Sequence, residues 1–294
     1  MSAFDTASVV VATNLGGVIE TPELESSPHR IDLDGRPYVP SGDGGIVLGV
    51  RLGDSVFATD ADHAAPGACL VHREQPARHA LTTFACLGNP VTMRSGAAAG
   101  ERGVVLGKRG ELGRVIACFP QDVLAQLAPG DAVVVRGFGQ GAQLPQPLHE
   151  QGVRMCNIAP EALSLLAVDA DGSRLVVSAR ARIPSHVVGN GVGRPVEQWD
   201  LDLQVSRRAA AAVGLSDLLL GDLVVVDDLD VRHNTGYRRG YCTVGLIVHG
   251  ASPQPGHGPG LMPMFCGPAD GFDVSVDADH RGLTEDALLG FAHT

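Results

Sequence analysis

The segment 61–67 carries the pair of side chains best suited to proton transfer. Asp62 and His63 are adjacent there, and Pro66 with Gly67 predicts a backbone turn that can bring neighbouring side chains together. Histidine exchanges protons near neutral pH, and an adjacent carboxylate can orient it. We therefore predict that Asp62 and His63 are catalytic. The alternative is an ordinary histidine on a surface loop.

A second candidate is the glycine-rich segment 248–260, which holds His249 and His257. Glycines on both sides of His257 let the backbone approach a ligand and present its N–H groups to an anion or a carbonyl. We predict that His257 is a catalytic acid or base and that His249 contacts the substrate.

The same histidines are also candidate ligands of a metal cofactor, and the sequence does not decide whether one is bound. Imidazole is a good ligand for zinc or iron, so His63, His249 and His257 are the residues expected to hold a divalent metal if one is bound. However, His249 and His257 are eight residues apart, which is not the spacing of known zinc motifs. Loop histidines that only form hydrogen bonds are therefore the favoured interpretation.

A third candidate is the segment 189–202. Its Gly-x-Gly-x-Gly start is followed by Arg194 and a proline, which does not fit a dinucleotide-binding helix. Arg194 can instead pair with a carboxylate or phosphate of a substrate, with Asn190 beside it. Trp199 is either a stacking wall or part of the core, and Asp200 either contacts the substrate or lines a solvated strand face together with Asp202.

The fourth candidate is the segment 86–89. Cys86 would be a catalytic nucleophile if a histidine lies nearby, and Asn89 would then polarise a substrate carbonyl. The alternative is a cysteine buried in a β core, with Asn89 in a left-handed turn.

Short apolar runs between Gly, Pro and Asp dominate the chain and predict the elements that position these loops. Runs of four to eight residues rich in Val and Ile are typical of strands, so the predicted fold is mainly β (α+β) with a few short helices. The predicted strands are 8–12, 45–50, 81–87, 104–106, 114–119, 132–135, 175–179, 223–226 and 243–249, and the predicted helices are 121–127, 160–166, 206–213 and 284–291.

An internal similarity predicts how these strands are grouped. Segments 127–135 and 219–226 both place a Gly-Asp turn before a valine-rich run, as small barrels do at their corners. We therefore expect two packed barrel-like lobes, 1–145 and 146–294, that share one pocket.

Several blocks occur in order between about residue 9 and residue 265: 53–55, 62–67, 86–89, 95–96 through 107–110, 137–141, 189–194 with 199–200, and 249–260. These blocks resemble the signature segments of a bacterial and archaeal family known as domain of unknown function number forty-four thirty-eight (DUF4438). The resemblance implies no reaction. Members often carry an acidic residue and a lysine in the turn that here spans 96–100, where this chain has alanines, so this turn lacks those charges.

Composition restricts the function further. The net charge of -11 and the absence of any long basic run argue against nucleic acid as a partner. The first residues match neither a secretion signal nor a membrane span, so we expect a cytoplasmic protein. Lys108 is the single lysine, which excludes most lysine-centred chemistry unless Lys108 itself reacts.

Two functional hypotheses follow. In the first, the chain is a hydrolase or lyase that uses His/Asp acid–base chemistry on a small polar, anionic or amide-containing metabolite. In the second, it binds such a metabolite without catalysis. We favour the enzyme, because several titratable residues on glycine-rich loops are more than binding alone needs. We also expect the chain to form a homo-oligomer.

Overall fold

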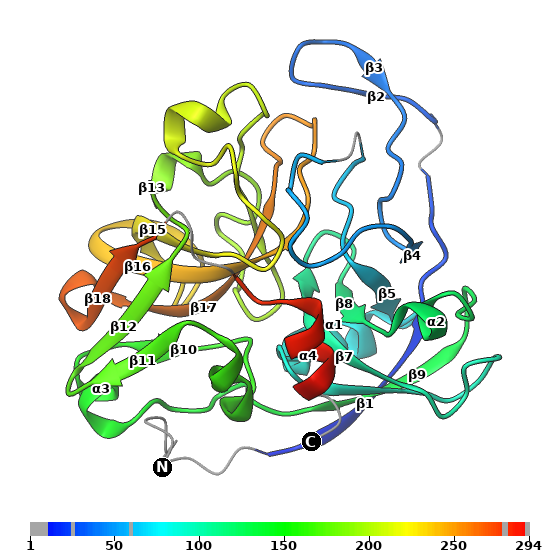
Figure 1. Ribbon diagram of the computed structural model, residues 1–294, viewed down its shortest axis with the longest axis horizontal. Helices are drawn as coiled ribbons and strands as arrows, with labels where there is room; N and C mark the ends of the chain where they lie inside the picture. The colour runs from blue at the N-terminus through cyan, green and yellow to red at the C-terminus, as the bar shows by residue number, and fades with distance from the viewer. Residues whose placement is uncertain (1–10, 25–26, 59–60, 278–281, 292–294) are drawn as a thin grey trace.

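The computed structural model describes residues 11–24, 27–58, 61–277 and 282–291. The chain is mainly β, as predicted, and its helices are short (Figure 1). The predicted strand at 8–12 lies mostly outside the described residues, and the first strand, β1, spans Thr13–Ile19. No helix in the described ranges combines the length and the apolar character needed to cross a membrane.

Six antiparallel strands of the first half form a closed barrel. The ring closes because β5 pairs with both β8 and β1, which removes the exposed sheet edges. Alternate side chains such as Leu70, Val105 and Val135 fill its interior. In order around the ring the strands are β1, β9 (Ala132–Gly137), β6 (Pro90–Met93), β7 (Arg102–Arg109), β8 (Arg114–Cys118) and β5 (Gly67–Val71), and β4 (Ile46–Val47) extends β5.

The strand predicted at 81–87 is wrong, because these residues complete helix α1 (Gln75–Phe84) and the turn after it. Pro76 suits the first turn of a helix, and Leu81 packs against Gly17 of β1. A short apolar run does not distinguish a strand from a buried helix end, which explains the error.

The second half is built on an open sheet. All its strand pairs are antiparallel except β13 with β15. Its strands in order are β10 (Arg154–Met155), β17 (Gly260–Pro268), β16 (Gly236–His249), β15 (Leu223–Asp230) and β13 (Ala181–Pro184), and β14 (Leu201–Asp202) also pairs with β17.

Smaller elements complete the fold. A hairpin of β2 (Arg30–Ile31) and β3 (Pro37–Tyr38) stands apart from both sheets at the top of Figure 1. The remaining elements are β11 (Val168–Asp171), β12 (Arg174–Ala179) and β18 (Phe272–Val276) in a three-stranded sheet; α2 (Gln121–Leu124), α3 (Gln146–Glu150) and α4 (Glu285–Phe291); and the 3-10 turns Pro160–Leu165, Ser185–Val187, Ala210–Val213 and Ala269–Gly271.

Both Gly-Asp turns form as predicted. Gly130 and Gly221 have φ of 90° and 95°, which favours glycine, and each precedes an aspartate. Asp131 accepts a hydrogen bond from the N–H of residue 128 at 2.9 Å, and Asp222 accepts one from residue 219 at 2.8 Å. These turns start β9 and β15. The domain boundary at 145/146 stays a prediction.

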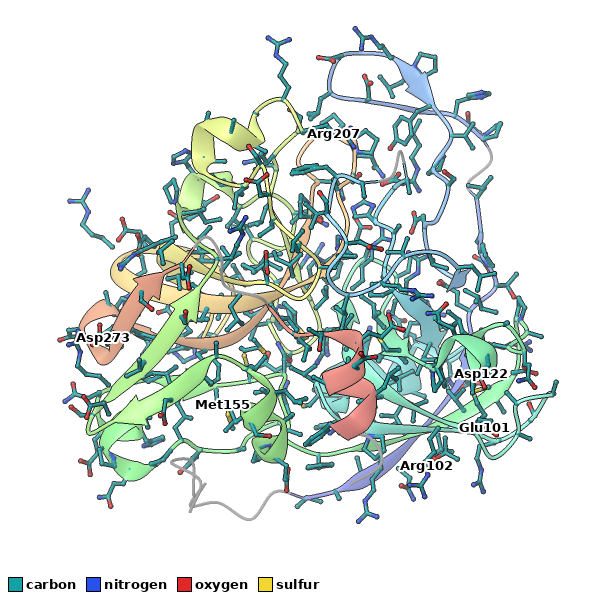
Figure 2. The ribbon with its side chains drawn as sticks, in the orientation of Figure 1. Glu101, Arg102, Asp122, Met155, Arg207 and Asp273 are labelled. Carbon is teal, nitrogen blue, oxygen red and sulfur yellow. The ribbon has the colours of Figure 1, made fainter. Side chains whose placement is uncertain are left out.

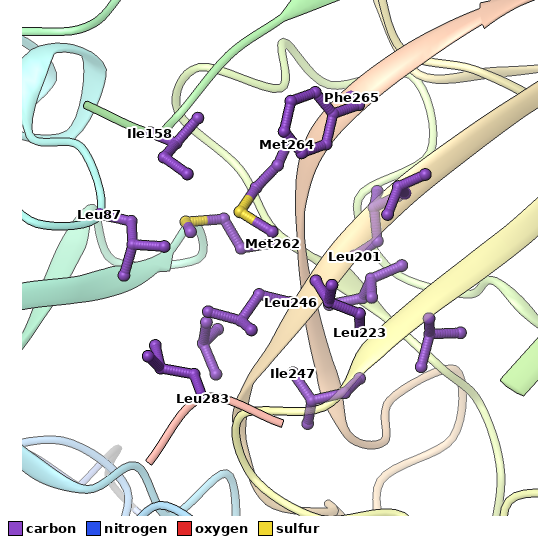
Figure 3. Close-up of a cluster of buried hydrophobic side chains, with 14 of the residues drawn as sticks. Leu87, Ile158, Leu201, Leu223, Leu246, Ile247, Met262, Met264, Phe265 and Leu283 are labelled. Atoms are coloured by element: carbon purple, nitrogen blue, oxygen red, sulfur yellow. The ribbon is translucent and has the colours of Figure 1, made fainter. Parts of the chain in front are cut away.

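The two halves share a continuous apolar core. Figure 3 shows Met262 and Met264 of β17 beside Leu246 of β16, with Leu87 and Ile158 facing them. Charged side chains such as Glu101, Arg102 and Asp122 stay on the outside of the barrel (Figure 2).

Gly107 allows a close approach of the two halves. A Cβ at this position of β7 would lie 2.7 Å from a side-chain carbon of Val248 in β16. Strand β7 of the barrel therefore lies against β16, and the ends of both strands reach the same place. The candidate site lies at that place.

Candidate functional site

Four side chains from separate segments meet where the two halves join. One ligand-type atom from each of His63, Glu111, Asp202 and His257 lies within 4.8 Å of all the others. We call this set the histidine–carboxylate cluster. His63 precedes β5, Glu111 follows β7, Asp202 ends β14, and His257 lies between β16 and β17. The structure thus brings His63 and His257 together, as a shared pocket requires.

His63 is fixed by its backbone. Its φ of 53° is a left-handed conformation that costs energy for a non-glycine residue, and such strain is typical of functional sites. The N–H of His63 donates to the carbonyl of Ala251 at 3.1 Å, which ties this loop to the end of β16. Its side chain is fully buried.

Asp62 orients His63. Nδ1 of His63 lies 2.7 Å from Oδ1 of Asp62 in a strongly bent contact. Burial alone would raise the pKa of Asp62, but the contact with His63 and the hydroxyl of Tyr38, which donates to Oδ2 at 3.0 Å, lower it well below its usual range. The pKa of His63 is lowered by burial and by the positive charge of Arg109. The predicted Asp62–His63 pair therefore exists in the structure.

Asp200, immediately before β14, and Asp202, at its end, lie on the same side of the chain because side chains alternate along an extended backbone. Both are buried, so the predicted alternative of a solvated strand face is wrong.

Oδ2 of Asp202 lies 3.1 Å from Nδ1 of His257. Oδ1 of Asp202 lies 3.7 Å from Nε2 of both His63 and His249 and has no hydrogen-bond partner in the described part of the chain. The face points into the cluster because Leu201 and Leu203 fill the core on the other side.

His249 lies next to the cluster, with its ring centre 5.1 Å from that of His63, and is fully buried. Its Nε2 is 2.8 Å from Oδ2 of Asp200, and its ring lies directly on the backbone of Gly260, where a Cβ would come within 2.0 Å of it. Burial would lower the pKa of His249, but the hydrogen bond and charge of Asp200 raise it overall. Neither His249 nor Asp200 is open to a substrate, so their predicted role as substrate contacts does not fit this geometry.

His257 and Glu111 form the accessible side of the cluster, with 17% and 26% of their side chains exposed. Nδ1 of His257 is 3.1 Å from Nε2 of His63 and 3.3 Å from Oε1 of Glu111. Burial would lower the pKa of His257, but the hydrogen bond to Asp202 and the carboxylate charges raise it. Asn190, predicted to bind substrate, donates from Nδ2 to Glu111 at 3.1 Å and to Asp202 at 3.2 Å.

A chain of buried ion pairs holds Glu111. Arg109 donates to Oε2 of Glu111 at 2.6 Å and also to Asp43. Arg114 donates to Asp43 at 2.8 Å and to Glu20 at 2.7 Å. Burial would raise the pKa of Asp43, but the two guanidinium groups lower it. Charges of alternating sign thus run along the outer face of the barrel from Glu20 to the cluster.

An open cleft of about 710 Å³ adjoins the cluster, which is enough for a small metabolite. Arg109, Glu111 and Gln254 line it, and Arg30 reaches it from the β2–β3 hairpin. Arg30 lies 3.5 Å from Asp62 and 3.7 Å from Asp43, so positive charge stands beside the acidic groups.

Two predicted site residues, Arg194 and Trp199, stack on each other outside the cluster. The guanidinium of Arg194 lies 4.7 Å from the centre of the Trp199 ring, and Arg194 is exposed. Trp199 lines a pocket of about 490 Å³ that also borders Glu111. Arg194 is thus not brought into the cluster, whereas Trp199 forms a wall near it.

Cys86 and Asn89 lie elsewhere. Cys86 is fully buried, burial raises the pKa of its thiol to about 11, and the charged side chain that acts on it is Lys108. Oδ1 of Asn89 accepts from the N–H groups of Cys86 and Phe138, and its Nδ2 donates to the Phe138 carbonyl, so Asn89 stabilises a turn. The predicted nucleophile is therefore corrected to a buried structural cysteine.

Sequence reasoning missed Glu111, Arg109 and Asp43 and gave Asp202 no specific role. Two weak signals were available. Asp200 and Asp202 share one strand face beside Asn190, and Arg109 with Glu111 flanks a glycine at the end of a strand. Neither pattern reveals which partner lies opposite in the fold.

Comparisons with known proteins agree over most of the chain. The model of the family described as domain of unknown function (DUF4438), N-terminal, matches residues 29–164, and that of DUF4438, C-terminal, matches residues 165–281. The solved structure described as the crystal structure of TM1086 is 31% identical, with a TM-score of 0.87 over 93% of this chain and 95% of that chain. A search of curated proteins finds no match.

Proposed function

This chain belongs to the DUF4438 family, as its signature segments predicted, and we propose that it is a small-molecule enzyme, a hydrolase or a lyase, acting on a small polar metabolite that is anionic or carries an amide. Its histidine–carboxylate cluster is the proposed catalytic centre. The observation that carries the proposal is the convergence of His63, Glu111, Asp202 and His257 from both halves beside an open cleft.

Energetics favour a functional role for this convergence. Burying charged groups costs several kcal/mol per ion before their partners compensate, and apolar side chains would join the two halves at least as well. Concentrated titratable groups with shifted pKa values beside a cleft are typical of catalytic sites. Asp62, Asn190 and Arg109 each hold one member of the cluster in place, as catalytic geometry requires.

The cleft suggests how a substrate binds. Arg30 is partly exposed on the β2–β3 hairpin, and Gln254 lies next to it with an amide that can donate or accept. We assign the anchoring of an anionic or amide group to this pair in place of Arg194. His257 and Glu111, the exposed members of the cluster, face the reacting part of the substrate.

Cytoplasmic localisation and self-association belong to the same proposal. All six cysteines are free, which suits a reducing compartment. Light scattering on the purified protein determines whether it is a homo-oligomer.

A panel of carboxylate, phosphate and amide metabolites, followed by mass spectrometry of the products, tests the proposal. We expect His257→Ala to lower turnover by about a hundredfold or more. Arg30→Ala should mainly raise KM, and Arg194→Ala is the matched control. The second candidate, a non-catalytic binding protein, is favoured if a metabolite binds without turnover and His257→Ala leaves its affinity unchanged.

A further inference from the structure

The centre of the cluster holds more hydrogen-bond acceptors than protons. Nδ1 of His257 can carry one proton, yet it faces Nε2 of His63 at 3.1 Å, Oδ2 of Asp202 at 3.1 Å and Oε1 of Glu111 at 3.3 Å. A single proton cannot serve three acceptors. The remaining lone pairs and two negative charges therefore face one another.

His63 does not relieve this deficit. A carboxylate oxygen 2.7 Å from Nδ1 stabilises the proton on that nitrogen, so Nε2 presents a lone pair to the centre. Asn190 donates from Nδ2 to Oε1 of Glu111 and to Oδ2 of Asp202, which leaves Oδ1 of Asp202 without a donor among the described residues.

Asp202 gives an independent indication. Its side chain is 4% exposed, and its Oδ1 has no hydrogen-bond partner among the residues described. An unpaired buried carboxylate oxygen is costly. This oxygen is directed towards the histidines, where a cation would satisfy it.

We propose that the histidine–carboxylate cluster binds one divalent transition-metal ion through Nε2 of His63, Nδ1 of His257 and carboxylate oxygens of Glu111 and Asp202. This inference rests on the proposed function and deepens it, because it names the cofactor of the same site. Two imidazoles with two carboxylates suit zinc, iron or manganese better than magnesium or calcium, which prefer oxygen alone.

The distances fit such an ion. Ligand atoms about 2.1 Å from a metal lie about 3.0 Å apart in an octahedron and about 3.4 Å apart in a tetrahedron. The contacts to Nδ1 of His257 are 3.1 to 3.3 Å, and Nε2 of His63 is 3.7 Å from Asp202. Small side-chain rotations would complete the coordination.

The surrounding groups also match a metal centre. Metal-binding histidines usually direct their second nitrogen to a carboxylate, as His63 does to Asp62. Arg109 and Asn190 hold the two carboxylate ligands. Two neighbouring sets of possible ligands are less suitable, because Asp43 is paired with arginines and Asp200 with His249.

The ion explains how the site performs hydrolysis or elimination. A divalent metal lowers the pKa of a coordinated water to about 7 and polarises a substrate oxygen. Since Glu111 lines the cleft, an ion held by this cluster would lie beside the cleft, within reach of a substrate there.

Elemental mass spectrometry of the full-length, tag-free protein tests the inference, followed by calorimetric titration of chelator-treated protein with Zn²⁺, Mn²⁺ or Mg²⁺ alone. We expect near-stoichiometric transition metal in the wild type and at least a hundredfold weaker Zn²⁺ binding in His257→Ala and Glu111→Gln. The exposed His233→Ala is the matched control and should bind as the wild type does. Circular dichroism verifies that each variant is folded.

The outcomes separate this inference from the proposed function. No transition-metal binding by folded wild type, or binding that survives both ligand variants, overturns the metal site. Turnover in such a metal-free protein would leave the proposed function standing. Stoichiometric metal that both variants lose, with no turnover on any substrate class, supports the site and counts against the enzyme.

Discussion

Asp62 contacts His63 but is not itself a proposed metal ligand. Replacing Asp62 therefore tests the orientation of His63 rather than direct metal binding. Replacing a carboxylate that holds a metal-binding histidine typically costs about 10- to 100-fold in metal affinity. We therefore expect Asp62→Asn to weaken Zn²⁺ binding by this factor while the fold persists. Calorimetric titration measures the change, with the exposed Asp34→Asn as control. Equal affinity in Asp62→Asn and the wild type would contradict the supporting role.

Lys108, the single lysine, is fully buried and predicts a pH effect on stability. Its Nζ donates to Asn157 at 2.9 Å and to the Glu197 carbonyl at 2.8 Å, and burial lowers its pKa to about 8. Below pH 8 both folded and unfolded chains are protonated, so the folded state carries the full cost of the buried charge. As pH rises from about 8 to 10.5, the folded chain loses this proton first, and the unfolding free energy should increase.

The unfolding free energy should increase by at most about 3 kcal/mol. This bound follows from the difference between the pKa of Lys108 in the unfolded and folded chains, at about 1.4 kcal/mol per pKa unit. Denaturant unfolding of the wild type and Lys108→Met at several pH values isolates the contribution of Lys108, because other groups titrate alike in both. A stability difference that does not change between pH 8 and 10 would show that the charge is not destabilised by burial.

At the scale of elements, Gly107 of β7 sets the approach of the barrel to β16. An added Cβ would lie 2.7 Å from Val248, and neither strand can move without disturbing the core. We expect Gly107→Ala to destabilise the protein by about 1 to 3 kcal/mol, as overpacking does. Gly16 of β1 has open space around its Cβ position, so Gly16→Ala is the matched control. Chemical denaturation of both variants measures the difference, and equal stability would be inconsistent with tight packing at Gly107.

The elements also show what the sequence could predict. Runs such as 132–135 and 223–226 predicted strands correctly, because each follows a Gly-Asp turn that limits the backbone locally. Helix α1 was missed, since its apolar residues are few and its burial depends on Gly17 of a distant strand.

The same reasoning applies to the cluster. His63, His257 and Asn190 lie on glycine-rich or turn-forming segments whose chemistry is visible in the sequence. Glu111 and Asp202 were not assigned to a site, because a charged residue after a strand or on one strand face is usually solvated. Their burial results from the packing of β7 and β14 against partners far away in the chain, and a single sequence does not encode that proximity in any local pattern.

At the scale of the whole molecule, the histidine–carboxylate cluster connects the two halves. His63 and Glu111 belong to the barrel half, and Asp202 and His257 belong to the half with the open sheet. A cation that binds all four is expected to stabilise both halves together. At a concentration about 100 times its Kd, a ligand adds about 2.7 kcal/mol to the folded state.

Hydrogen exchange of chelator-treated protein, with and without Zn²⁺, should therefore show slower exchange in four segments at once: 61–66, 109–113, 199–203 and 249–260. Amides that exchange when the two halves separate at the cluster should exchange about 100-fold more slowly, since their exchange rate follows the free energy of that separation. His257→Ala should abolish the effect in all four segments, including those more than a hundred residues away in the chain. Protection confined to the loop around His257 would instead indicate a surface site, because an ion held by one loop leaves the contact between the halves unchanged.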